Sequence, residues 1–130
     1  MIGGTDISIP TFAETPAMDV GVRAILREWP QAVFEDPISG QPFDRYEALP
    51  FGHLRELFVY RDQHVARAWE DEGAVPSLAN TMIHLLASPT HLTLVLDDLS
   101  SQSMHRILSA IRCGLRMDIL NLTVQPKEAA

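Results

Sequence analysis

The apolar pattern is clearest in the middle of the chain, where it predicts a strand followed by a short helix. Four β-favouring apolar residues at 57–60 are flanked by charge, which is typical of a strand buried on both faces or nearly so. Asp62 can then cap a helix over 62–72. Three acids at 70–72 would stand at the negative end of that helix's dipole, so a strand at 64–70 stays open as an alternative.

The next apolar segments predict a hairpin. Residues 92–96 alternate well enough for a strand, and a Ser-Pro-Thr break at 88–90 separates them from the apolar residues 82–87. The segment before the break also suits a helix, one face of which would carry Leu78, Met82, Leu85 and Leu86. We favour the strand, which would pair with 92–96 across the break.

Two amphipathic patterns predict helices at either end of the chain. The first begins at Asp19, a potential cap, and stops before Pro30. The second begins after Ser100 or Ser101, either of which can cap it, and Gly114 is a potential end. Their apolar stripes are, in turn, Val22, Ile25, Leu26 and Trp29, and Met104, Ile107, Leu108, Ile111 and Leu115.

The remaining segments complete the predicted order of elements. Residues 32–34 read as a short strand that 43–46 can join after a turn-rich connection, and 117–124 read as a final strand. Residues 1–17 are expected to form an extended arm and 125–130 a frayed tail, leaving a single domain at 18–124. The order predicts an α+β domain with a mixed or mainly antiparallel sheet of about five strands and helices packed on one face.

Composition excludes several classes of partner. The chain has 130 residues and a net charge of −7, which argues against sequence-independent nucleic-acid binding and against binding to an anionic membrane surface. Residues 101–130 nevertheless carry four basic residues against two acids, so a small basic face is expected. One cysteine, Cys113, rules out an intrachain disulfide, and no signal-like start is present, so a cytoplasmic location is expected.

The most suggestive polar pair is Asp97-Asp98. Two carboxylates between a predicted strand and a helix stand where ligands and metals often bind in α/β proteins. The simpler interpretation, which we favour, is that they leave the core and support the following helix, because adjacent side chains of a strand point to opposite faces. Phosphate-loop, dinucleotide, serine-hydrolase and zinc signatures are absent from the sequence, which lowers the expectation of catalysis.

The five histidines offer a weaker hypothesis. None stands at zinc-ligand spacing, so no metal and no cofactor is predicted. In the predicted hairpin, however, His84 and His91 would be close to cross-strand neighbours. Together with Arg61 and the Asp97-Asp98 pair, they form the candidate site for a ligand or a small enzymatic activity.

A second candidate surface is the run from Trp69 through Glu70, Asp71 and Glu72, which would face a protein partner. Burial of the tryptophan with the acids in water is the simpler interpretation. Small size, acidity and missing catalytic signatures favour a non-catalytic protein-binding domain, in the manner of antitoxin, immunity or adaptor proteins. The alternatives are a small enzyme or ligand-binding protein with a polar site near Asp97 and Asp98, and a homodimer paired through a sheet edge.

Overall fold

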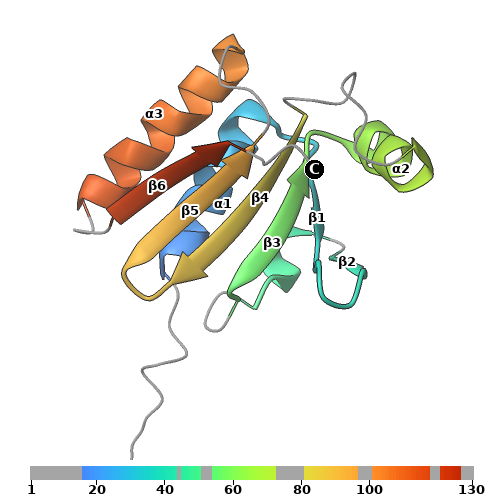
Figure 1. The fold of residues 1–130 in the computed structure, drawn as a ribbon, viewed down its shortest axis with the longest axis horizontal. Helices are drawn as coiled ribbons and strands as arrows, with labels where there is room; N and C mark the ends of the chain where they lie inside the picture. Colours follow the sequence, from blue (N-terminus) through green and yellow to red (C-terminus); the bar gives the residue numbers. More distant parts are fainter. Residues whose placement is uncertain are drawn as a thin grey trace, which may run out of the picture.

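The computed structural model describes residues 16–43, 45–50, 54–72, 81–96, 101–117 and 121–126. Within them the elements follow the predicted order (Figure 1). They are α1 (Pro16–Glu28), β1 (Val33–Glu35), β2 (Pro42–Phe43), the 3-10 helix η3 (Tyr46–Ala48), β3 (Glu56–Tyr60), α2 (Gln63–Glu72), β4 (Met82–Ser88), β5 (His91–Leu96), α3 (Gln102–Met117) and β6 (Asn121–Pro126). The chain is therefore a single small α+β domain, as predicted.

The strands form one mixed sheet in the order β2-β1-β3-β4-β5-β6, one strand more than expected. All neighbours are antiparallel except β5 and β6, which are parallel. The exception arises because α3 connects these two strands, and a helical crossover returns the chain in the same direction.

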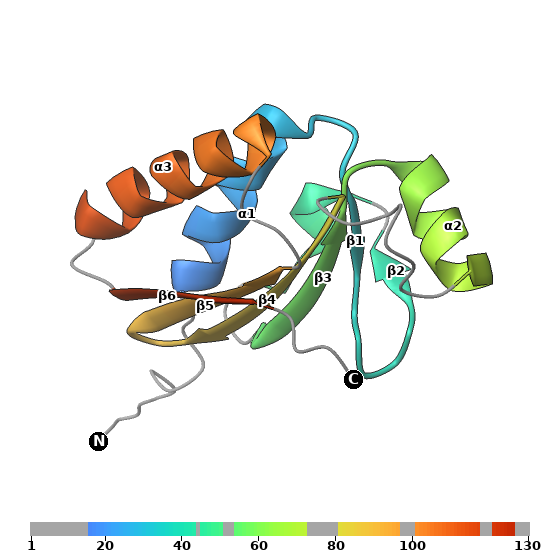
Figure 2. The same ribbon diagram turned by 45° about the horizontal axis from the view of Figure 1, so that its top comes forward.

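The core lies between the sheet and the two longer helices. Alternate residues of β3, β4 and β5 are fully or almost fully buried: Leu57, Val59, Ile83, Leu85, Leu92, Leu94 and Leu96. The apolar stripes of α1 and α3 cover this face, and Figure 2 shows both helices on the same side of the sheet. The alternate apolar residues of the strands and the apolar stripes of the two helices therefore pack against each other in one layer.

The structure settles the alternatives in the middle of the chain. Residues 82–88 form a strand, and residues 63–72 form a helix instead of a strand. The backbone N–H of Val65 donates to Oδ1 of Asp62 at 2.9 Å, so the predicted cap of α2 is confirmed. The N–H of Met104 likewise donates to Oγ of Ser101 at 3.3 Å.

Four predicted boundaries are wrong. The strand expected at 43–46 is limited to Pro42–Phe43, and Tyr46 belongs to η3. Helix α1 begins at Pro16, so Asp19 lies in its first turn and is not its cap. Helix α3 continues past Gly114 to Met117, because Leu115 is buried and extends the apolar stripe. The final strand is Asn121–Pro126, later than the pattern placed it. The expected N-terminal arm lies, apart from its last two residues, outside the described residues.

Gly114 instead allows α1 and α3 to approach closely. A Cβ atom at this position would stand 2.7 Å from Cγ1 of Val20 on α1, well inside ordinary van der Waals contact. The absence of a side chain at Gly114 therefore sets the spacing between the two helices.

Candidate functional site

Of the residues expected near the Asp97-Asp98 pair, His84 is paired with Val95 near the end of β5, and Arg61 lies farther from that end, across β4. Arg61 directly follows β3, and its backbone N–H donates to the carbonyl of Thr81 at 2.8 Å. Because β3 and β5 both run antiparallel to β4, they end at the same edge, about 10 Å apart across β4. Asp97 and Asp98 themselves lie outside the described residues. The side chain of Arg61 is paired with Asp62, with its Nε 3.3 Å from Oδ2.

His84 and His91 are not cross-strand neighbours, contrary to the expectation. The tight turn of the hairpin pairs Ser88 with His91, which places His84 opposite Val95. The two histidines therefore share a face of the sheet but lie about 13 Å apart along the strands.

Each histidine instead has a partner of its own. Nε2 of His84 lies 2.7 Å from Oε2 of Glu56, and the rings of His84 and Phe58 form an edge-to-face pair with a centroid distance of 4.7 Å. Nε2 of His91 lies 2.5 Å from Oγ1 of Thr123. Within the described ranges, no three histidine, cysteine, aspartate or glutamate side chains gather as metal ligands would.

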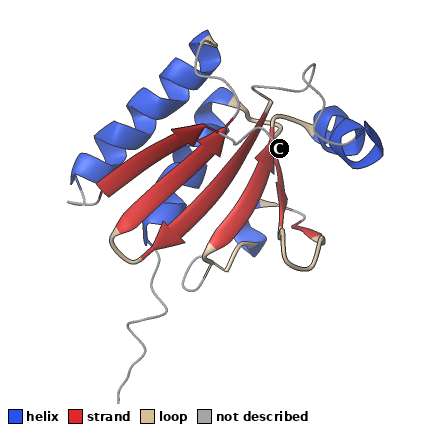
Figure 3. Cartoon of the chain, viewed as in Figure 1, coloured by secondary structure: helices blue, strands red, loops and turns tan. Residues whose placement is uncertain are grey.

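The sheet surface turned away from α1 and α3, which we call the open face, carries a mixed set of side chains. The strand register places them in rows across β3, β4 and β5, and Figure 3 shows these strands with α1 behind them and no described helix in front. The open-face residues of these strands are Glu56, Phe58, Tyr60, Met82, His84, Leu86, Ser88, His91, Thr93 and Val95. All except the buried Tyr60 are half-buried.

An acidic group borders the open face where α2 meets β3. The hydroxyl of Tyr60 donates to the carboxylate of Glu35, and burial, reinforced by the charges of Glu35 and Glu70, raises the pKa of Tyr60 to about 12. Burial first, and then the charge of Glu70, raise the pKa of Glu35, which the hydrogen bond from Tyr60 opposes. Of the predicted partner patch, Glu70 and Asp71 are exposed, whereas Trp69 is half-buried.

A cleft of about 620 Å³ lies where the end of α1, the start of β1, η3 and the start of α2 meet. Its walls combine an apolar side, including Leu26 and Phe34, with polar groups from Tyr46, Asp62 and His64. Its volume is within the range of small-molecule sites.

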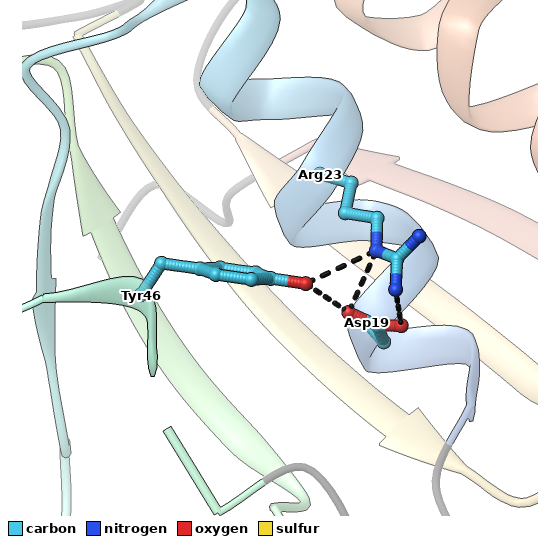
Figure 4. A network of polar contacts seen from close by, with 3 residues as sticks. All are labelled: Asp19, Arg23 and Tyr46. Carbon is cyan, nitrogen blue, oxygen red and sulfur yellow. Dashed lines mark hydrogen bonds and ion pairs between the residues drawn. The ribbon is translucent and has the colours of Figure 1, made fainter. Parts of the chain in front are cut away.

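A polar network beside this cleft fixes η3 against α1 (Figure 4). The hydroxyl of Tyr46 donates to Oδ1 of Asp19 at 2.5 Å, and Nε of Arg23 donates to the same hydroxyl at 3.0 Å. A terminal nitrogen of the guanidinium lies 3.0 Å from Oδ2 of Asp19. Burial first, and then the hydrogen bond to Asp19, raise the pKa of Tyr46, while the hydrogen bond from Arg23 opposes them.

Sequence reasoning identified the strands of the open face but not the open face itself. In β4, apolar residues occupy both odd and even positions and therefore both faces of the strand. In β5, the apolar Val95 lies between buried leucines, on the opposite face. Apolar residues on both faces were the sequence signal for an apolar open face, although they are equally typical of a strand that is covered on both sides. The Asp19–Tyr46 contact joins residues 27 apart and has no local sequence signal.

Comparison with known proteins gives no match to a family model, a curated protein or a solved structure. None of the helices in the described ranges has both the length and the apolar character needed to span a bilayer.

Proposed function

We propose that the protein is a non-catalytic protein-binding domain of the adaptor, immunity or antitoxin kind, which receives a partner on its open face. The observation that carries the proposal is the set of half-buried apolar side chains Phe58, Met82, Leu86 and Val95, gathered on adjacent strands. Contiguous apolar side chains rimmed by polar ones are typical of protein interaction surfaces. The single cysteine is the basis for retaining a cytoplasmic location in this proposal.

Charge specifies the partner's chemistry. Glu35 and Glu56 lie on the open face, and Glu70 lies close enough to raise the pKa of Glu35. A partner segment that combines apolar side chains with lysine or arginine therefore complements this surface.

The test uses fluorescently labelled peptides of equal length that combine apolar residues with either lysine and arginine or aspartate and glutamate. Binding to the purified protein is followed by fluorescence anisotropy. We expect the basic set to bind more tightly than the acidic set. Leu86→Lys should weaken this binding about tenfold, because it removes apolar area and adds a repelling charge.

The matched control is Ile38→Lys, which makes the same charge change at a side chain that is 85% exposed in the turn between β1 and β2. It should bind the basic peptides like the unmodified protein. Equal affinity for both peptide sets, or unchanged binding by Leu86→Lys, would reject the proposal. Sedimentation provides a further outcome: self-association that Leu86→Lys abolishes, without peptide binding, would make a second copy of this chain the occupant.

A second candidate function, binding of a small molecule, is favoured by the cleft of about 620 Å³ beside Tyr46 and His64. The polar site expected at Asp97 and Asp98 stays a proposal of the same class. A fragment library titrated by NMR should shift resonances around Tyr46 and His64 together if the cleft is used. Shifts scattered over the surface would argue against it.

A further inference from the structure

Helices α1 and α3 differ in charge from the rest of the described chain. Helices α1 and α3 carry five arginines and two acids: Arg23, Arg27, Arg106, Arg112, Arg116, Asp19 and Glu28. The other described residues have the opposite balance, with eight acids and four arginines. Because the two helices pack side by side on one face of the sheet, they bring together basic residues that are far apart in the sequence (Figure 2).

Between the two helices runs a groove of about 600 Å³, which we call the arginine groove. Its lining is small and apolar along both helices, with arginine, serine and cysteine as its polar members. The lining residues are Val20, Arg23, Ala24, Arg27, Ser109, Ala110, Cys113 and Gly114. Gly114 has no side chain and lies close to Val20. The floor of the groove therefore carries no large side chain there, and the space above it is free.

The arginines differ in how their charge is compensated. Arg23 is held by Asp19 and Tyr46, and Arg106 lies 2.9 Å from Oε1 of Glu28. Arg27, in the lining, has no ion-pair partner in the part of the chain that the structure describes.

Two further arginines extend the basic surface beyond the groove lining. Arg112 and Arg116 are exposed one turn apart on α3, Arg116 lies one turn beyond Cys113, and neither has an ion-pair partner among the described residues. Counting only partners among the described residues, the groove therefore has arginines without an ion pair both in its lining and beside it.

We propose that the arginine groove binds an acidic amphipathic helix of a partner protein. An apolar edge of such a helix fits the floor of small side chains, as in helix-in-groove recognition, with contacts at i, i+3, i+4 and i+7. Its flanking carboxylates reach Arg27 and Arg116, and arginine pairs with carboxylates through two parallel hydrogen bonds. This partner differs in charge from the one proposed for the open face, so the two surfaces would let one domain join two different proteins.

Nucleic acid fits the groove less well. A phosphate backbone needs a continuous basic track, whereas the basic side chains here border an apolar floor on a chain with a net charge of −7. The apolar floor contributes only if the ligand presents apolar side chains together with its charge.

The experiment uses a labelled synthetic helix of about four turns, with glutamate on one side and leucine and alanine on the other. Anisotropy measures its binding to the full chain, in parallel with a charge-inverted lysine version and with polyglutamate. Cys113, the only cysteine and an exposed lining residue, provides an independent readout through its rate of reaction with a thiol reagent. We expect saturable binding of the acidic helix alone, weakened by salt, together with protection of Cys113.

Arg27→Glu should weaken this binding about tenfold, since it replaces an attraction with a repulsion at a single position. The matched control is Arg67→Glu, the same reversal at an exposed position of α2. The control should bind like the unmodified protein, and so should Leu86→Lys on the open face. Conversely, Arg27→Glu should still bind the basic apolar peptides. The two peptide assays therefore test the open face and the arginine groove independently of each other.

Three results would overturn the proposal. Equal binding of polyglutamate and the acidic helix would show a purely electrostatic surface. Binding of the acidic helix without protection of Cys113 would place it elsewhere. Equal effects of Arg27→Glu and Arg67→Glu would show that only the net charge matters.

Discussion

Replacing Gly114 with alanine sets two physical effects against each other. Gly114 lies inside α3, where alanine is more favourable than glycine by about 1 kcal/mol. If helix propensity alone mattered, the substitution would stabilise the protein. The new Cβ, however, would stand 2.7 Å from Cγ1 of Val20, where about 3.5–4.0 Å is usual.

The crowding is difficult to relieve. Valine in a helix has essentially one χ1 rotamer, so Cγ1 of Val20 cannot turn away, and the two helices must move apart. Overpacking of this kind costs about 1–3 kcal/mol. After subtraction of the propensity gain, we expect Gly114→Ala to lower the free energy of unfolding by about 1 kcal/mol.

The assay is urea unfolding of a double-mutant cycle with Val20→Ala, followed by tryptophan fluorescence. Removing Cγ1 removes the clash, so in the Val20→Ala background Gly114→Ala should become stabilising by up to about 1 kcal/mol. Ser109→Ala, at an exposed position of the same helix, provides the control and should have the same effect in both backgrounds.

The refuting result is additivity. Independent sites add within about 0.5 kcal/mol, so a Gly114→Ala effect of the same sign and size in both backgrounds would mean that Val20 does not limit the approach of α1 and α3. The floor of the arginine groove would then need another explanation.

Two further predictions concern α2 and the strand before it. Asp62→Ala should reduce the free energy of unfolding by about 1 kcal/mol, because α2 loses its cap. Asp62→Asn should cost less, because asparagine can also cap a helix. Chemical denaturation at neutral pH compares the two variants, and equal losses would contradict the capping role. The pKa of Tyr60 is raised from 10.0 to about 12 in the folded protein. Protonated Tyr60 therefore contributes fully to the free energy of unfolding below pH 10, and this contribution is lost as the pH rises towards 12. The unmodified protein should lose roughly 1–2 kcal/mol of unfolding free energy between about pH 10 and 12, and Tyr60→Phe should not. If Tyr60→Phe loses the same amount, the loss does not come from Tyr60.

Local sequence signals were sufficient for the order of the helices and strands and for two of the helix caps. The caps at Asp62 and Ser101 depend on side chains within three residues of the groups they bind, so they could be predicted. Asp19 shows the limit of such reasoning. Its carboxylate has the chemistry of a cap, yet the helix begins earlier, and its partner Tyr46 comes from a segment 27 residues away.

The candidate site was less predictable, because register decides which side chains meet. A two-residue turn places His84 opposite Val95 and separates it from His91, although both lie on the face that was expected. Neither propensity nor periodicity fixes a pairing, since each reports on a single segment.

The sequence by itself determined the order of helices and strands and most of the apolar stripes of α1 and α3, because helical periodicity records which side of a helix is buried. Only the tertiary structure decided which side of the sheet stays open, how closely Gly114 lets two helices approach, and where charge accumulates. Arg27 and Arg116 are 89 positions apart and belong to one basic surface only because α1 and α3 pack together. That packing is set by the summed burial of many side chains, which no local segment contains.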